Sequence, residues 1–454
     1  MTSVLIANRG EIACRIIRTC REMNLETIAV YSEADARARH VLEADQAHLL
    51  GPAPVRESYL NFDAVLAAAQ ASSAMLVHPG YGLLAENAGF AEAVEASGLR
   101  WVGPRADTIS VMGDKARARA FAVDADVPVV PGSPLLDVND DLGVLGVAER
   151  IGYPVLVKAS GGGGGIGMCR ADGPDTLVKT VRSVSDLALR HFGDGGVFIE
   201  RYVRRARHVE VQVFGLGDGR VFDLGDRDCS IQRRYQKIIE EGPAPRLSCA
   251  TRAAMAAAAC RLASHQRYAG AGTVEFILDA DSDEFFFLEM NTRIQVEHPV
   301  TEMITDTDIV ALQLQLALGK NLSSYCHTAR DAAGHALECR LYAERPERKF
   351  LPSPGTLKRL RFPKVSSDLR IDTGFVEGDV ITPHYDPLVA KIIVRGRNRV
   401  EALNRMELAL KRVEITGLST NLDFLRRALS HQDFRGASMD TSFVDRHLEG
   451  LIRG

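Results

Sequence analysis

The 454-residue sequence lacks the features that would place it in a membrane, an export pathway or a nucleic-acid complex. No apolar run approaches the roughly 20 residues that span a bilayer, and the apolar stretch at 2–8 is too short for a signal peptide. A formal net charge of −4 provides no bulk basic field for nucleic acid or anionic lipid. We therefore expect a cytoplasmic protein that binds neither membranes nor nucleic acid.

Paired cysteines and a dinucleotide-binding motif are also missing. The eight cysteines form no CxxC and no paired metal-ligand spacing, so we expect reduced, mostly buried thiols. Gly10 opens a predicted helix after the first strand, but no GxGxxG occurs there, which argues against dinucleotide binding.

The length and the order of the predicted elements favour several α/β domains. A chain this long exceeds what one hydrophobic core usually organises, so roughly two to four domains are expected. Strand-like segments at 3–7, 27–31, 75–77 and 99–102 alternate with helical spacing. They predict a doubly wound parallel sheet in a first domain at 1–113.

Two further domains are expected downstream. The segment 114–318 has helices and strands in α+β order, and the alternation at 209–213 is typical of a half-buried strand. A polar linker follows, and 333–446 mixes strands, turns and a helix. The predicted fold class is therefore α/β, with an α+β middle domain and a mixed α+β C-terminal domain.

A run of glycines at 161–165 follows a predicted strand that ends at Lys158. Each glycine costs roughly 0.5–1 kcal/mol relative to alanine in regular structure, so stability does not explain five in succession. One interpretation is a mobile flap whose amides lie on phosphate oxygens, with Lys158 as a point charge. The alternative is a flexible surface loop.

Two carboxylates, Glu275 and Glu289, lie in or at the end of predicted apolar strands, and Asn291 follows the second. Neighbouring antiparallel strands would bring the acids together, where a hard cation such as Mg²⁺ or Mn²⁺ would relieve their repulsion. Two solvated strand-end acids are the alternative, which fits Glu275 alone better than it fits Glu289 with Asn291.

The next segment combines a cation, an amide and an acid. Arg293, Gln295 and Glu297 would point to one face if the chain is extended there, because side chains alternate along a strand. Such a face can bind a small oxyanion and take a proton from it. A surface strand with an ion pair is the alternative, which this segment alone does not exclude.

Several motifs, in order, resemble those of the biotin carboxylase family. They are Asn8-Arg-Gly-Glu-Ile12, His78-Pro-Gly-Tyr-Gly82 with Glu86-Asn87, Met112-Gly-Asp-Lys115, Lys158-Ala-Ser160 with its glycines, Arg227-Asp-Cys-Ser-Ile-Gln-Arg-Arg234, and 289–305. The similarity extends over essentially the whole chain and ends with Glu338-Cys-Arg340 and 350–355. It implies an ATP-grasp fold at 114–318, including a mobile glycine-rich lid at about 131–204.

The resemblance also implies a role for each matching position. Positions expected to contact ATP are Lys115, Lys158, Gly163, Gly164, Gly165, Glu200, Val203, His208, Gln232, Lys237, Glu275 and Glu289. Those expected to hold Mg²⁺ or Mn²⁺, at two sites, are Glu275, Glu289 and Asn291. The bicarbonate pocket would consist of Lys237, Arg293, Gln295, Val296 and Glu297, with Glu297 as general base. Tyr81 and Arg340 would contact biotin, and Arg340 would steady its enolate.

The implied reaction is ATP-driven carboxylation of biotin through carboxyphosphate, which gives carboxybiotin, ADP and phosphate. No Ala-Met-Lys-Met biotinyl motif occurs, so biotin is expected on a separate carrier protein, with a carboxyltransferase as a further partner. A homodimer is the family expectation. Acetyl-CoA carboxylase, in fatty acid biosynthesis, is the expected whole enzyme, with propionyl-CoA, another acyl-CoA or pyruvate as alternative acceptors.

Two positions depart from the family pattern. Ile166 stands where a basic residue is usual, and Tyr235 stands where histidine is commonest. We expect these departures to tune activity rather than abolish it. Two alternative functions remain open: another ATP-grasp ligase that makes an acyl phosphate for amine attack, and a catalytically silent nucleotide-binding assembly subunit.

Overall fold

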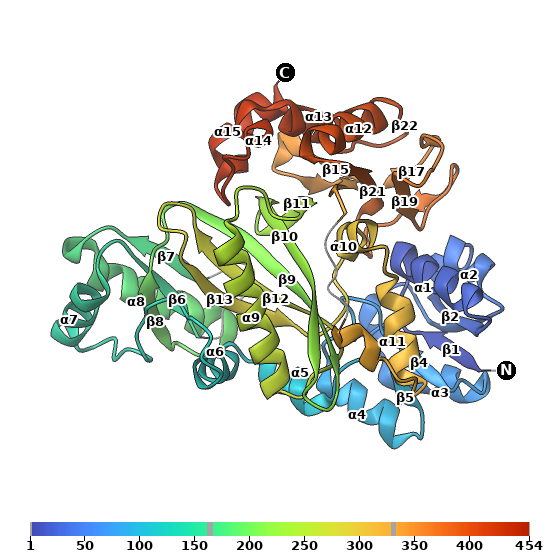
Figure 1. The fold of residues 1–454 in the computed structure, drawn as a ribbon, viewed down its shortest axis with the longest axis horizontal. Coiled ribbons are helices and arrows are strands. Elements are labelled where there is room, and N and C mark those ends of the chain that lie inside the picture. Colours follow the sequence, from blue (N-terminus) through green and yellow to red (C-terminus); the bar gives the residue numbers. More distant parts are fainter. Residues whose placement is uncertain (1, 161–166, 328–332, 454) are drawn as a thin grey trace.

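The computed structural model describes residues 2–160, 167–327 and 333–453. Figure 1 shows a parallel sheet with its helices beside the N-terminus, a small unit that projects on the opposite side, and a long twisted sheet between them. The C-terminal helices cover one end of that long sheet. The predicted glycine flap at 161–165 and the departure at Ile166 lie outside the described residues.

The N-terminal sheet is parallel, in the order β3-β2-β1-β4-β5. Its strands are β1 (Ser3–Ile6), β2 (Glu26–Ser32), β3 (Gln46–Gly51), β4 (Leu76–His78) and β5 (Arg100–Trp101). The helices are α1 (Gly10–Glu22), α2 (Arg39–Glu43), α3 (Phe62–Ala71), α4 (Ala88–Ala96) and α5 (Ala106–Gly113). The doubly wound sheet predicted from the sequence is confirmed.

The carboxyl ends of β1 and β4 meet where the strand order reverses, the place at which open α/β sheets bind ligands. The Asn8 side-chain amide joins the two ends by donating to the carbonyl oxygens of Pro79 (2.6 Å) and Tyr81 (2.8 Å). Gly10 begins α1 with φ +65°. A Cβ on Gly374 would lie 2.5 Å from the Gly10 carbonyl carbon, so a loop of the C-terminal part docks directly on this turn.

The small unit has its own sheet, helices and core. Its antiparallel strands, in the order β7-β6-β8, are β6 (Val155–Ala159), β7 (Met168–Ala171) and β8 (Val197–Arg201). They pack against α7 (Asp141–Ile151) and α8 (Pro174–Phe192) through valines, leucine and alanines. Helix α6 (Lys115–Asp124) leads into the unit and begins where the Asp114 side chain accepts hydrogen bonds from two backbone amides.

The long sheet has eight strands in the order β13-β12-β9-β10-β11-β14-β21-β19, all paired antiparallel. They are β9 (Ala206–Leu216), β10 (Val221–Arg233), β11 (Gln236–Gly242), β12 (Ala269–Asp279), β13 (Phe285–Asn291), β14 (His335–Tyr342), β19 (Leu369–Thr373) and β21 (Leu388–Gly396). Strands β14, β19 and β21 fall in the predicted C-terminal domain, yet they continue the sheet of the middle region. The two regions therefore share one sheet.

Strand β9 differs from its prediction. Its valines pack into the core as expected, but Glu210 and Gln212 on the other face are 0% exposed. The prediction of a half-buried strand was wrong because this polar face points into buried ion pairs instead of solvent. Helices α9 (Cys249–His265), α10 (His298–Thr305) and α11 (Ile309–Ala317) pack around the sheet.

Four helices complete the C-terminal part: α12 (Arg399–Lys411), α13 (Leu422–Ser430), α14 (Gln432–Arg435) and α15 (Phe443–Ile452). Its short strands are β15 (Glu344–Arg345), β16 (Leu351–Pro352), β17 (Gly355–Thr356), β18 (Arg359–Arg361), β20 (Val380–Ile381) and β22 (Glu414–Thr416). Apolar side chains of α12, α13 and α15 cover β14 and β21, which gives this part the largest core cluster among the described residues.

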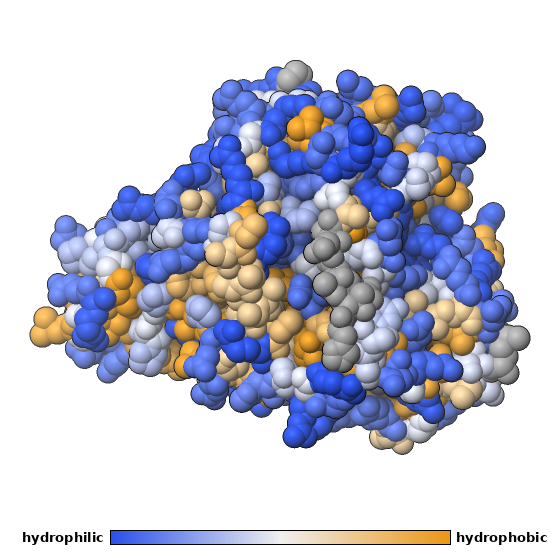
Figure 2. Space-filling view, viewed as in Figure 1, coloured by the Kyte–Doolittle hydropathy of each residue, from blue (hydrophilic) through white to orange (hydrophobic). Residues whose placement is uncertain are grey.

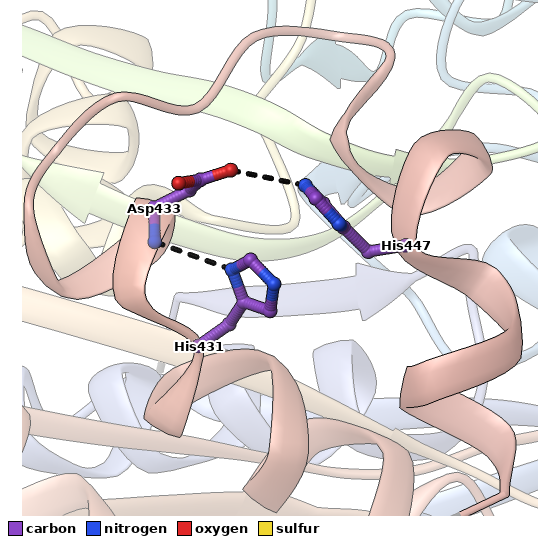
Figure 3. A group of neighbouring side chains, drawn as sticks. All are labelled: His431, Asp433 and His447. Carbon is purple, nitrogen blue, oxygen red and sulfur yellow. Dashed lines mark hydrogen bonds and ion pairs between the residues drawn. The ribbon is translucent and has the colours of Figure 1, made fainter.

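His431, Asp433 and His447 form a small cluster between the last helices (Figure 3). Potential ligand atoms of the three lie within 4.8 Å of one another. The His447 ring nitrogen lies 3.0 Å from an Asp433 carboxylate oxygen, and His431 Nδ1 accepts the Asp433 backbone N–H at 3.2 Å. Both imidazole rings also pack on Phe443. These contacts account for the three residues as links between α14 and α15.

The visible face of the molecule is mostly hydrophilic (Figure 2). The paler apolar area at its centre lies over α9, whose exposed side includes Ala253, Ala254 and Ala257. These methyl groups are small, so the area is not a patch of large apolar side chains. In the described ranges, no helix combines the length and the apolarity needed to cross a bilayer.

Candidate active site

A cleft of about 1280 Å³ lies where the N-terminal sheet, the small unit and the long sheet face one another. It collects most of the residues predicted from the sequence. They are Tyr81, Lys115, Lys158, Glu200, His208, Gln232, Lys237, Glu275, Glu289, Asn291, Arg293, Gln295, Val296, Glu297 and Arg340. Val203 is buried after β8 and is not among the lining residues, and Gly163, Gly164 and Gly165 lie outside the described residues.

Lys237 is the centre of the deep end of the cleft. Its Nζ lies 2.6 Å from Glu210, 2.7 Å from Glu275 and 2.7 Å from Glu297, each distance taken to a carboxylate oxygen. Burial alone would lower the pKa of Lys237, but attraction to the three carboxylates raises it well above the usual range. The ammonium group therefore stays charged and holds three acids together.

Glu297 is fully buried between two cations. One oxygen contacts Lys237 at 2.7 Å, and the other accepts a hydrogen bond from Arg340 Nη2 at 2.9 Å. Burial would raise the pKa of this carboxyl, yet Lys237, Arg340 and Arg227 hold it well below the usual range. Glu297 is therefore a carboxylate, the form that can accept a proton.

The segment after β13 is irregular, so the conditional expectation of an extended strand through Glu297 was wrong. Glu297 instead precedes α10 as its N-cap residue. The polar side chains nevertheless converge: Arg293 donates to Gln295 Oε1 (2.7 Å) and to Asn291 Oδ1 (2.8 Å). A third hydrogen bond, from Arg293 Nε to Glu86 (2.8 Å), fixes the guanidinium against the N-terminal part of the chain.

The two predicted metal-facing acids are cross-strand partners. Glu275 of β12 lies directly opposite Glu289 of β13, which confirms the expected juxtaposition. Glu275 also receives hydrogen bonds from Asn291 Nδ2 (2.9 Å) and Gln295 Nε2 (3.0 Å). Burial and the neighbouring charge of Glu275 raise the pKa of Glu289. Two facing carboxylates and an amide oxygen are a donor set that fits Mg²⁺ or Mn²⁺, because a cation would remove this repulsion.

The opposite end of the cleft has cations in excess. The Glu200 carboxylate forms ion pairs with Lys158 and with Arg119, whose Nη1 lies 3.3 Å away. Lys115, at the first turn of α6, also lines the cleft, and its charge acts on Glu289. Such a group of cations suits a polyanion, because an anionic ligand would balance their charge.

His208 lies between the two ends. Its Nε2 is 2.8 Å from Glu275, and its Nδ1 is 2.8 Å from the Gln232 side-chain amide. Burial would lower the pKa of His208, but attraction to Glu275 raises it. The neighbouring Glu275 therefore favours the charged form of the imidazole.

Sequence reasoning missed Glu210, whose oxygens contact Arg227 Nε and Lys237 Nζ, both at 2.6 Å. The alternation at 209–213 indicated its face of the strand but not what covers that face. The fully buried Arg227 belongs to a motif that resembles the family, and it was the available signal for a buried acid nearby. Glu86 was likewise noted only as part of a motif.

The small unit and the long sheet, facing each other across this charged cleft, define the ATP-grasp fold. Residues 114–325 match the family model for the ATP-binding domain of the carbamoyl-phosphate synthase L chain. Residues 1–109 and 338–446 match the models for the N-terminal and C-terminal domains of biotin carboxylase. The chain belongs to the biotin carboxylase family.

Individual relatives agree with this assignment. Biotin carboxylase 1 of Bacillus subtilis is 46% identical over 442 residues, which cover 97% of this chain and 98% of that protein. The mitochondrial methylcrotonoyl-CoA carboxylase subunit alpha of Glycine max is 46% identical over 449 residues, 99% of this chain. The chain spans only 61% of that subunit, and 64% of the corresponding subunit of Dictyostelium discoideum.

Solved structures show the same likeness. The biotin carboxylase domain of the 2-oxoglutarate carboxylase of Hydrogenobacter thermophilus, a dimer in complex with MgADP, ADP and bicarbonate, superimposes with a TM-score of 0.91. It is 40% identical, and the match covers 100% of this chain and 99% of that one. Biotin carboxylase of Campylobacter jejuni gives a TM-score of 0.91 at 39% identity, over 98% of this chain and 99% of that one.

Proposed function

We propose that this chain catalyses the ATP-dependent carboxylation of biotin held on a carrier, with bicarbonate as the carbon source. One observation supports this above all others: the buried Glu297 carboxylate lies between Lys237 and Arg340 at the deep end of a cleft whose other end is rich in cations. A general base, an anion pocket and a phosphate site are then within one cavity, as coupling ATP to bicarbonate requires.

Glu297 would take the proton of bicarbonate. Bicarbonate is an anion and would compete for Lys237 and Arg293, so its arrival would weaken the ion pairs that keep the pKa of Glu297 low. The deprotonated oxygen then attacks the γ-phosphorus of ATP; the new P–O bond gives carboxyphosphate, and the bond to ADP breaks. Gln295 and Val296 would line the same pocket.

The cation-rich end would bind the nucleotide. Lys115, Lys158 and His208 would contact phosphates, Glu200 and Val203 would lie at the adenine, and Gly163, Gly164 and Gly165 would cover the phosphates. Glu275, Glu289 and Asn291 would hold Mg²⁺ or Mn²⁺, which neutralises phosphate charge when bound. The proposed domains are 1–113, 114–318 and 333–446, and the unit at 131–204 within the second would act as a lid on the cleft. The closed lid would exclude water, which otherwise hydrolyses carboxyphosphate.

Biotin would enter beside Arg340 and Tyr81. Carboxyphosphate releases CO₂ and phosphate; the phosphate takes the ureido N–H proton, and the ureido nitrogen attacks CO₂. Negative charge develops on the ureido oxygen during this step, and Arg340 is the adjacent fixed cation. The Tyr81 hydroxyl contacts Glu11, which fixes the ring at the mouth of the pocket.

The proposal extends to the molecule that finally accepts the carboxyl group and to the proteins that act with this chain. A methylcrotonoyl-CoA carboxylase subunit among the relatives makes 3-methylcrotonyl-CoA a candidate acceptor beside acetyl-CoA. We retain acetyl-CoA as the first acceptor to test, with a biotin carrier and a carboxyltransferase as partners. The dimeric 2-oxoglutarate carboxylase domain supports a homodimer.

The experiment is phosphate release from ATP with bicarbonate, with and without free biotin, together with capture of ¹⁴C-carboxybiotin. We expect turnover that requires bicarbonate and increases with biotin. Turnover that ignores biotin but produces an amide from an added amine would favour another ATP-grasp ligase. Nucleotide binding without turnover would favour a silent assembly subunit.

A further inference from the structure

Two acids that the proposed reaction does not use lie next to Arg340 on the long sheet. Glu240 of β11 and Glu338 of β14 are cross-strand partners, and both are 0% exposed. Side chains at directly opposed positions share a face, with Cβ atoms about 4.5–5.5 Å apart. Arg340 stands two residues after Glu338 on the same strand and therefore points to the same side of the sheet.

Only one of the four oxygens of this pair has a partner among the residues that the structure describes. Arg340 Nη2 forms an ion pair with Glu240 Oε1 at 2.6 Å. The other oxygen of Glu240 and both oxygens of Glu338 accept no hydrogen bond. A fully ionised pair would bury two like charges side by side with a single ion-pair contact between them, which is strongly unfavourable.

The surrounding charges do not neutralise the pair. Arg340 is shared with Glu297, which accepts its hydrogen bond at 2.9 Å. Lys391 faces Glu338 from β21, but its Nζ donates to the Val296 carbonyl (2.8 Å) and lies 3.1 Å from Glu11. Lys237 acts on Glu240 while it contacts three other carboxylates. Each facing cation is already engaged by another acid.

We propose that Glu240 and Glu338 hold one proton between them, and that this half-neutralised carboxyl pair positions Arg340 for the biotin step. One carboxylic acid would donate to the other carboxylate, so each retains a hydrogen bond and a single negative charge faces Arg340. Two carboxyl groups that share a buried site behave in this way in general. The inference rests on the proposed function for the role of Arg340, but the shared proton itself does not.

Burial and the charges around the pair agree with this arrangement. Burial raises the pKa of Glu240 to about 7, against the attraction of Arg340. Burial and the neighbouring Glu240 raise the pKa of Glu338 well above the usual range, against Lys391 and Arg340. A raised pKa means that the native state binds the proton more tightly, so this stabilisation is complete below the unfolded-state value and lost as the pH rises through about 7.

The consequence for catalysis is specific. When the pair loses its proton, its second negative charge competes more strongly with Glu297 for Arg340, whose Nη2 already lies 2.6 Å from Glu240 and 2.9 Å from Glu297. The biotin-dependent rate should therefore fall at alkaline pH relative to the bicarbonate-dependent ATP turnover measured without biotin. Glu338→Gln replaces the shared O–H by an amide N–H that does not titrate, so this alkaline fall should disappear.

The test compares the wild type, Glu338→Gln and Glu240→Gln across pH, with the biotin-dependent rate divided by the biotin-independent rate. Glu240→Gln removes the charge that faces Arg340 and should raise the KM for biotin about ten-fold, the loss expected for one charged contact. Infrared difference spectra across pH should show a buried carboxylic acid band in the wild type that Glu338→Gln lacks.

Glu241→Gln is the matched control. Glu241 is the next residue on the same strand with the same burial, but it lies on the other face, where Arg399 and His335 contact it. It should leave both the pH profile and the infrared band of the wild type in place, whatever its effect on stability.

The outcomes separate the two proposals. An alkaline fall and an acid band that both persist in Glu338→Gln would overturn the shared proton. The absence of biotin-dependent carboxylation in the wild type would overturn the proposed function, while the infrared comparison would still decide the protonation of the pair. An acid band that disappears in Glu338→Gln without a change in the pH profile would overturn the positioning of Arg340.

Discussion

The two ends of the cleft are each centred on one ion, and the two central ions have opposite signs. At the cation-rich end, the proposed nucleotide end, one carboxylate, Glu200, is contacted by two cations, Lys158 and Arg119. At the deep end one cation, Lys237, is contacted by three carboxylates. The first end has positive charge available for a polyanion such as a triphosphate. The second can accept cations and protons, as the proposed base and the proposed metal-facing acids require.

This difference also separates the effects of mutation. Removing one cation from the nucleotide end leaves Glu200 with the other as its partner. Such a variant should therefore bind ATP more weakly while its folded state stays nearly as stable. Removing Lys237 leaves buried carboxylates without their shared cation. Such a variant should therefore lose free energy of unfolding as well as catalytic activity. Each variant below tests one side of this contrast, from the largest expected effect to the smallest.

Glu297→Gln should lower the bicarbonate-dependent rate by about 10²–10⁴-fold, the usual contribution of a general base. The amide keeps the size of the side chain but cannot take the bicarbonate proton. Steady-state phosphate release measures the rate, and nucleotide affinity from titration calorimetry should change little because Glu297 contacts Lys237 and Arg340 rather than Lys158 or Arg119. A near-normal rate would exclude Glu297 as the base.

Lys237→Met should destabilise the fold by about 3–5 kcal/mol, the cost of leaving buried charges unpaired. The matched variant Lys158→Met should cost only about 1 kcal/mol, because Glu200 keeps Arg119. Urea unfolding of both variants gives the two values. Equal losses would show that the charge ratios do not control stability at the two ends.

Acid should weaken the deep end more than the nucleotide end. Lys237 and its neighbours lower the pKa values of Glu275 and Glu297 in the folded chain, so the folded state binds fewer protons than the unfolded state. This stabilisation is present above the unfolded value of about 4.3 and is lost as the pH falls toward the folded values. Unfolding free energies across that range should fall less steeply in Glu275→Gln than in the wild type.

Lys158→Gln should raise the KM for ATP about ten-fold, the loss expected for one charge-assisted contact, with a smaller change in kcat. The KM for bicarbonate should stay near the wild-type value, because Lys158 contacts the nucleotide end only. A selective change in the bicarbonate KM would contradict the division of the cleft.

Tyr235→His should change kcat/KM by less than about two-fold, since exposed substitutions usually stay within about 0.5 kcal/mol. Tyr235 is 64% exposed and lies in the tight turn between β10 and β11, at the rim of the cleft. Steady-state kinetics at saturating bicarbonate checks this. A change above ten-fold would give this family departure a direct part in binding.

Part of the site was predictable from local signals, and the resemblance to the family supplied other positions such as Lys237, His208 and Arg340. The alternation of strands and helices before residue 113 fixed the parallel sheet, and the strands that hold Glu275 and Glu289 indicated their pairing. Glu210, Glu240 and Glu338 could not be recognised in this way. Their roles depend on which strands become neighbours, and the pairing of β11 with β14 joins residues almost a hundred positions apart. Periodicity within one strand contains no such information.

The pairing of β11 with β14 also has a consequence during synthesis on the ribosome. Until residues 335–342 have emerged, β11 is an edge strand whose backbone groups await a partner, and such edges invite pairing with other chains. Glu240 and Glu241 lie on that edge. Before β14 covers them they are solvated and ionised, and their charge opposes association between nascent chains. The acid proposed to share a proton in the finished protein would thus oppose aggregation of the unfinished one.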